Sequence, residues 1–309
     1  MDWNSAYITE LIERALAEDA GAGDATVAAT IPPNATVQAR ILAKQDLVCA
    51  GLLLAELIFK KLDQRMIVVL RAKDGQFVKK GELLLHLSGK AAAILTGERT
   101  ALNFLGRLSG IATLTRRFTE QLAGTRAKIR DTRKTTPGLR LLEKYAVEMG
   151  GGTNHRIGLF DAILLKENHI ALVGGVKAAM DQAHAFAVAQ MQPRAMTAYE
   201  AVGTTPLPAE AASLPIQIEV RNEAELREAL GAGAASVLLD NMTPVAARRC
   251  VKIARGLRAD CIVELSGGIT LQNARPYAET GADYLSSGAL THSAPAADVS
   301  LLVDSIQEK

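Results

Sequence analysis

The sequence is poor in cysteine and has no apolar run long enough to cross a membrane. Its three cysteines, Cys49, Cys250 and Cys261, are an odd number without the spacing of a metal site, which suits a reducing compartment. A membrane-spanning helix needs about 20 apolar residues, and none is present. The N-terminus MDWNSAYITELIERALAEDAG lacks the basic region and apolar core of a signal peptide. We therefore expect a cytoplasmic protein without a membrane partner.

A strong net charge is also missing. The formal net charge is +2, and no basic arm or block of like charges occurs, so nothing here indicates a nucleic-acid partner. Hydrophobic residues make up 49% of the chain and charged residues 22%, as in soluble globular proteins. With 309 residues, the chain is long enough for two domains and a sizeable core.

The first third of the chain mixes helices with strands of alternating pattern. Helical spacing predicts helices over Ser5–Glu18, Gly51–Leu62 and Ala91–Ile111. Alternation at Val37–Ile41 and Leu83–Leu87, and the β-branched run Met66–Leu70, predict strands, and Asp74-Gly75 and Lys80-Gly81 are turn signals. We expect an antiparallel sheet covered by helices.

From about residue 113, short apolar strands alternate with helices. The expected strands are Lys128–Thr132, Ala162–Lys166, Ile216–Val220, Ser236–Asp240, Cys261–Ser266 and Asp283–Ser287. The expected helices between them are Val176–Met191, Glu223–Leu230, Pro244–Leu257 and Leu271–Glu279. This alternation indicates parallel strands, in a barrel or an open sheet. The proline-containing stretch 192–215 is expected to be an extended loop.

Most of these strands end in a polar group. Lys166, Glu219, Asp240, Ser266 (with Glu264 before it) and Ser287 occupy these positions. In a barrel of parallel strands the C-terminal ends share one mouth, where active sites lie. The loops Ser266-Gly267-Gly268 and Ser287-Gly288-Ala289 can offer backbone N–H groups to a phosphate.

Hydrogen-bond donors cluster between residues 130 and 169. The donors are Arg133, Lys134, His155, Arg156 and Lys166. They lie beside turns on either side of an expected helix. This helix is expected to have Thr136 as its N-cap and Pro137 as its first residue, and to end at Gly150. If the turns converge, they form a pocket for an anion with several carboxylates or phosphates. The alternative is that each is a solvated surface residue, or that the histidine is structural.

Glu219 and Asp240 are candidate ligands of a divalent cation. Mg²⁺ prefers one or two carboxylates together with phosphate oxygens and water. The alternative is that both carboxylates form ion pairs with nearby lysines and arginines.

Seven segments of the sequence resemble the quinolinate phosphoribosyltransferase family. They are ERTALNFLGRLSGIATLT (98–115), DTRKTTPGLR (131–140), GGGTNHRIGLFDAILLKENH (150–169), IEV (218–220), LLDN (238–241), ELSGGI (264–269) and SSGALTHS (286–293). They occur in the order of the family and cover nearly the whole chain.

The resemblance implies a two-domain α/β subunit. Residues 1–112 would form an N-terminal α/β sandwich domain, residues 113–290 an incomplete parallel α/β barrel of about six or seven strands, and residues 291–309 a C-terminal segment that packs back on the N-terminal domain. It also implies a homodimer in which the N-terminal domain of one subunit closes the barrel mouth of the other, so that Arg99 reaches a neighbouring active site.

The resemblance also implies a role for each site residue. Arg99, Thr132, Arg133, Lys134, His155, Arg156 and Lys166 would bind the pyridine dicarboxylate. Glu219 and Asp240 would meet the ribose hydroxyls and Mg²⁺ of phosphoribosyl pyrophosphate. Ser266, Gly267, Gly268, Ser287, Gly288 and Ala289 would hold its 5′-phosphate, and His292 would lie near the pyrophosphate. Lys134, Lys166, Glu219 and Asp240 would be catalytic.

The implied activity is transfer of a phosphoribosyl group to quinolinate with decarboxylation, in the biosynthesis of NAD. Three alternatives stay open at this point: an aldolase-like enzyme with a Schiff base on Lys166, a related enzyme that uses the same pocket for another substrate, such as a molybdenum-transport-associated relative, and a non-enzymatic sensor of phosphates or dicarboxylates.

Overall fold

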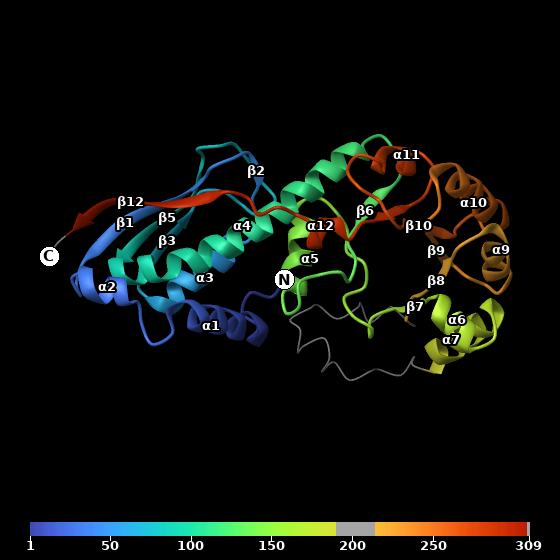
Figure 1. Cartoon of the computed structure of the whole chain (residues 1–309), viewed down its shortest axis with the longest axis horizontal. Helices are drawn as coiled ribbons and strands as arrows, with labels where there is room; N and C mark the ends of the chain where they lie inside the picture. Colours follow the sequence, from blue (N-terminus) through green and yellow to red (C-terminus); the bar gives the residue numbers. More distant parts are fainter. Residues whose placement is uncertain (190–213, 308–309) are drawn as a thin grey trace.

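The computed structural model describes residues 1–189 and 214–307. The molecule is elongated: an antiparallel sheet lies at one end, a parallel sheet at the other, and the long helix α4 runs from one to the other (Figure 1). The mixed fold expected from the sequence, a small α/β domain beside an incomplete parallel barrel, is confirmed.

The N-terminal domain is built on a four-stranded antiparallel sheet in the order β12-β1-β5-β3. Its strands are β1 (Thr36–Ala43), β3 (Ile67–Leu70), β5 (Leu83–Lys90) and β12 (Val299–Gln307). Strands β2 (Leu47–Val48) and β4 (Phe77–Val78) form a separate pair. Helices α1 (Ala6–Ala20), α2 (Ala25–Thr30) and α3 (Leu52–Leu62) complete the domain. Since β12 pairs along the whole of β1, the C-terminal segment lies on the N-terminal domain.

Helix α4 (Ala91–Gln121) continues beyond Ile111, the end predicted for it, and passes through the expected domain boundary at residue 112. The C-terminal chain crosses α4 closely on its way to β12. A Cβ atom on Gly110 would clash with the Pro295 carbonyl oxygen, and one on Gly106 would lie 2.8 Å from that of Ala297. Gly106 and Gly110 therefore leave room for the path of the returning chain.

The second domain is a six-stranded parallel sheet in the order β6-β11-β10-β9-β8-β7. The strands are β6 (Lys128–Arg130), β7 (Ile163–Leu165), β8 (Ile216–Val220), β9 (Ser236–Asp240), β10 (Ile262–Ser266) and β11 (Tyr284–Ser286). Because the last strand, β11, pairs with the first, β6, the sheet curls into a barrel. No pairing joins β6 to β7 in the described chain; Thr153 instead bridges to Arg130, so the barrel is incomplete.

The barrel interior is largely polar, in contrast to the apolar filling that is usual for barrels. Successive residues of a strand point to opposite faces. One face of each strand packs in the apolar core, as Ile218, Val237 and Val263 do. The other face carries polar side chains, among them Gln217 and Glu264, which hydrogen-bond to each other. The apolar core therefore lies between strands and helices, and the inside of the barrel is left for polar groups.

Helices follow the strands. They are α5 (Arg140–Met149), α6 (Glu167–Leu172), α7 (Val176–Ala189), α9 (Glu223–Gly231), α10 (Pro244–Leu257), α11 (Ala274–Ala278) and α12 (Ala289–His292). Asn222 and Thr243 cap α9 and α10, since each side chain accepts a backbone N–H bond. None of the described helices is long and apolar enough to cross a membrane.

The prediction for the start of α5 is wrong. The helix begins at Arg140, so Pro137 is not its first residue and Thr136 does not cap it. Thr136 instead gives its N–H and its hydroxyl to the Glu143 carboxylate. Most of the loop expected at 192–215, and the end of the helix expected to reach Met191, lie outside the described residues.

Candidate active site

The C-terminal ends of the parallel strands surround a cleft of about 600 Å³. It is lined by Thr132, Arg133, Lys134, His155, Arg156, Leu164, Lys166, Glu219, Leu238, Asp240, Asn241, Glu264, Ser266, Gly267, Gly268 and Ser286. Eleven of the residues predicted from the sequence are in this set. The lining residues come from all six strands of the barrel or from the segments that follow them. Strand order thus brings together residues that are far apart in the chain.

Cations line one part of the cleft. Arg133 and Lys134 are exposed on the turn after β6, where the Lys134 N–H donates to the Thr132 hydroxyl at 3.0 Å. Arg156 is half-buried, and its Nη1 donates to the Ala162 carbonyl at 2.9 Å. Burial, followed by repulsion from Arg133, lowers the pKa of Arg156. Two guanidinium groups are therefore held close together, an arrangement that an anion stabilises.

The carboxylates Glu219 and Asp240 line the same cleft. Lys166 Nζ is 3.8 Å from Glu219 Oε2. Burial raises the pKa of Glu219, Lys166 opposes this shift, and Asp240 adds to it by repulsion. No group of three or more His, Cys, Asp or Glu is arranged to hold a metal ion in the described part of the chain. The pair suits a cation that takes its remaining ligands from substrate and water.

A buried ion pair lies next to the turn that carries Arg133 and Lys134. Lys144 of α5 lies 2.7 Å from Asp131, whose side chain is fully buried. Asp131 also accepts the His155 N–H at 2.7 Å, and Lys144 donates to the His155 carbonyl at 2.9 Å. Burial raises the pKa of Asp131 to about 6, while Lys144 opposes the shift. The pair joins the two segments that carry Arg133 and Arg156.

The loop after β10 requires glycine. Gly267 has φ +98°, and a Cβ atom there would clash with Asn241 Oδ1. Asn241, itself at φ 53°, donates through Nδ2 to Asp240 Oδ2 at 2.7 Å. The close approach of the two loops therefore orients the Asp240 carboxylate.

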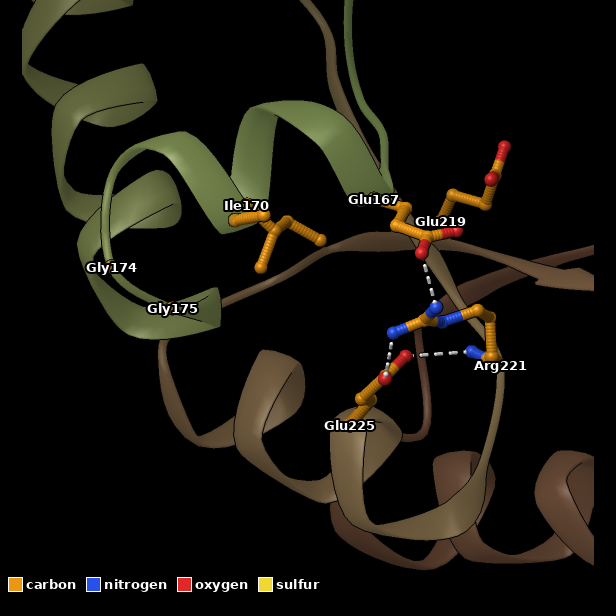
Figure 2. Close-up of a pocket in the computed structure, with 8 residues that line it drawn as sticks. Glu167, Ile170, Gly174, Gly175, Glu219, Arg221 and Glu225 are labelled. Carbon is orange, nitrogen blue, oxygen red and sulfur yellow. Dashed lines mark hydrogen bonds and ion pairs between the residues drawn. The ribbon is translucent and has the colours of Figure 1, made fainter.

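A smaller pocket adjoins the cleft and shares Glu219 with it. Figure 2 shows Arg221 between Glu167 and Glu225, with ion pairs of 2.7 and 2.9 Å. Arg221 thereby connects the start of α6, next to Lys166, with α9. Its ion pairs are solvent-exposed, so they contribute little stability by themselves.

Five predicted residues do not line the cleft of this chain: Arg99, Ser287, Gly288, Ala289 and His292. Arg99 is exposed on α4. Ser287 is buried and donates to the Ile269 carbonyl at 2.7 Å. A Cβ atom on Gly288 would lie 2.9 Å from both Lys134 Cδ and His292 Nε2, so this loop lies directly behind Lys134. Ala289 begins α12.

Five lining residues were given no role in the site from the sequence, although Glu264 was noted near the end of its strand: Leu164, Leu238, Asn241, Glu264 and Ser286. The available signal for Glu264 is a charged residue inside an otherwise apolar strand. Asn241 follows Asp240 at a strand end, where asparagine readily adopts a positive φ. Nothing local marks the two leucines.

The chain matches one family along nearly its whole length. Residues 24–109 match the quinolinate phosphoribosyl transferase N-terminal domain, and residues 111–197 and 205–302 match the C-terminal domain. The probable nicotinate-nucleotide pyrophosphorylase (carboxylating) of Bacillus subtilis is 40% identical, over 96% of this chain and 94% of that protein. The chloroplastic nicotinate-nucleotide pyrophosphorylase (carboxylating) of Oryza sativa is 38% identical, over 95% and 77%.

Solved structures give the same result. NadC from Streptococcus pyogenes aligns with a TM-score of 0.84 at 35% identity, over 97% of this chain and 96% of that one. The nicotinate-nucleotide pyrophosphorylase from Francisella tularensis aligns with a TM-score of 0.84 at 35% identity, over 96% of each chain.

Proposed function

The chain belongs to the quinolinate phosphoribosyltransferase family, and on that premise we propose that it transfers the phosphoribosyl group of phosphoribosyl pyrophosphate to quinolinate. The products are nicotinate mononucleotide, pyrophosphate and CO₂, in the de novo biosynthesis of NAD. One observation carries the proposal: a single cleft combines four cationic side chains with two neighbouring carboxylates. The Schiff-base and sensor alternatives have no comparable support.

The cations suit the pyridine dicarboxylate. Quinolinate carries two carboxylates on one small ring, and each needs fixed donors. Arg133 and Arg156 offer planar guanidinium groups for bidentate contacts, and Lys134 and Lys166 offer point charges. Thr132 belongs to the same turn.

Glu219 and Asp240 suit the ribose end of phosphoribosyl pyrophosphate. These two residues would hold Mg²⁺ together with substrate oxygens, and the ion would neutralise charge on the pyrophosphate. The carboxylates would also stabilise the positive charge that develops on the ribose as an oxocarbenium-like transition state forms.

The bond changes need no covalent enzyme intermediate. The pyridine nitrogen forms a bond to the anomeric carbon, and the bond from that carbon to pyrophosphate breaks with its electron pair leaving on oxygen. The carboxylate next to the nitrogen then leaves as CO₂, and its bonding pair stays on the ring carbon, which takes a proton. Lys134 and Lys166 supply the positive field for this step.

The loops Ser266-Gly267-Gly268 and Ser287-Gly288-Ala289 would hold the 5′-phosphate through backbone N–H groups. His292 would lie near the pyrophosphate. We also propose a homodimer in which Arg99 of a second copy completes the cleft, and a cytoplasmic location, supported by three free cysteines.

The test is pyrophosphate release from phosphoribosyl pyrophosphate and Mg²⁺, with quinolinate or nicotinate as acceptor. We expect release with quinolinate, accompanied by an equal amount of CO₂, and none with nicotinate. Release with nicotinate alone, or with neither acceptor, would overturn the proposed reaction.

A further inference from the structure

A cluster of polar side chains lies inside the barrel, directly beneath the cleft. Its centre is Glu264 of β10, which is fully buried. Glu264 accepts from Arg130 of β6 at 2.9 Å and Gln217 of β8 at 3.0 Å, and from the Ser286 hydroxyl of β11. Gln217 also reaches Ser236 of β9 at 3.2 Å. This floor cluster therefore joins five of the six strands.

The charge of Glu264 is already balanced within the floor cluster. Arg130 pairs with it, and the Arg130 guanidinium carbon lies 3.5 Å from the centre of the Tyr284 ring. A buried carboxylate that has an arginine partner and two further donors needs no second cation.

The orientation of the Gln217 amide follows from its partners. Its Nε2 faces Glu264 Oε2, an acceptor only, so the amide nitrogen must be on that side. Its Oε1 then faces His155 Nε2 at 3.1 Å, where it can only accept. Gln217 thus requires a proton on His155 Nε2.

The other ring nitrogen leads to the same conclusion. His155 Nδ1 lies 2.7 Å from the backbone nitrogen of Arg156, whose N–H can only donate. Nδ1 must therefore be the unprotonated nitrogen. A proton there would face another N–H, so this contact disfavours the imidazolium form.

Resting on the function proposed above, we propose that Gln217 and Glu264 are positioning residues that hold His155 as the neutral Nε2–H tautomer. Both ring nitrogens are then used within the protein. His155 then lines the cleft as an uncharged side chain. The positive charge that binds the carboxylates comes from Arg133, Arg156, Lys134 and Lys166.

The charged groups around His155 agree with this assignment. Burial lowers its pKa most; Glu264 and the hydrogen bond to Gln217 oppose the shift, and Arg130 and Lys144 add to it. Asp131 accepts the backbone N–H of the same residue.

The direct test is a ¹H–¹⁵N spectrum of the histidine rings in the unliganded full chain at pH 7. The chain has five histidines, and His155→Gln identifies the signals of residue 155 by their loss. We expect a protonated Nε2 and an unprotonated Nδ1. A protonated Nδ1, or an imidazolium, would overturn the proposal. This measurement needs no turnover, so it is independent of whether the proposed reaction occurs.

Gln217→Met tests the positioning role. It removes the acceptor of Nε2–H and leaves Glu264 Oε1, 3.6 Å away, as the nearest carboxylate. The hydrogen bond to Gln217 raises the pKa of His155, so we expect His155 in this variant to become protonated only at lower pH than in the wild type. We expect the KM for quinolinate to rise about tenfold while that for phosphoribosyl pyrophosphate changes less than about twofold.

Ser236→Ala is the matched control, because it removes the other hydrogen bond of Gln217 and leaves those to His155 and Glu264 in place. We expect an unchanged His155 spectrum and KM. A folded Gln217→Met protein with the wild-type spectrum and wild-type KM would contradict the proposal; if this variant does not fold, the wild-type spectrum alone decides.

Discussion

Among single residues, Arg133 is expected to contribute strongly to quinolinate binding. It is exposed to the cleft and close enough to Arg156 to lower the pKa of that group, so an anion between them gains two guanidinium partners. We expect Arg133→Ala to lower kcat/KM for quinolinate about 100-fold, or about 3 kcal/mol, because a charge-assisted bidentate contact is lost. Arg248→Ala, on the exposed side of α10, is the control. Near-normal turnover of Arg133→Ala would mean that Arg133 does not bind the substrate.

The pH dependence should report Glu219. Its pKa is raised, first by burial and then by Asp240 and Glu167. The ionised form is needed to stabilise positive charge, so kcat/KM should fall as pH drops through this raised pKa. Glu167→Gln removes one repelling charge, lowers the pKa of Glu219, and should move the acidic limb to lower pH without changing the plateau.

Glu225→Gln is the control for that shift. Glu225 pairs with the same arginine as Glu167 but is not among the groups that shift the pKa of Glu219 (Figure 2). The acidic limb of the pH profile of Glu225→Gln should match that of the wild type. An unmoved limb in Glu167→Gln would assign the limb to another group.

At the scale of elements, Glu143 connects α5 to α4 and to the segment before α5. This fully buried carboxylate pairs with Arg107 of α4 at 2.7 Å and accepts from Thr136. Arg107 also donates to the Thr291 and Ala294 carbonyls. We expect Glu143→Gln to lower the free energy of unfolding by about 3 kcal/mol, since it breaks a buried ion pair. Urea unfolding measures this, with Glu148→Gln, exposed on the same helix, expected within about 0.5 kcal/mol of the wild type.

Sequence patterns predicted the positions of helices and strands better than the contacts between distant side chains. The strand positions and the caps at Asn222 and Thr243 follow from short local signals, so they could be predicted. Thr136 was placed wrongly because its partner is the Glu143 side chain, which no local pattern reveals. Gln217 and Glu264 were visible as polar residues in apolar strands. The hydrogen bond between them depends on the curvature and closure of the barrel. The sequence indicated that closure only through the family resemblance.

At the scale of the whole molecule, the role of Arg99 depends on assembly. It lies on α4 and does not line the cleft of its own chain, so it can act only if a second copy brings it there. We expect Arg99→Ala and Lys166→Ala each to lose most activity. Subunits of the two variants, mixed and allowed to exchange, should regain about one quarter of wild-type activity: about half of the dimers are mixed, and each mixed dimer has one intact site of two. No recovery after verified exchange would mean that Arg99 does not complete the site of a neighbour, and full activity of Arg99→Ala alone would exclude it from catalysis.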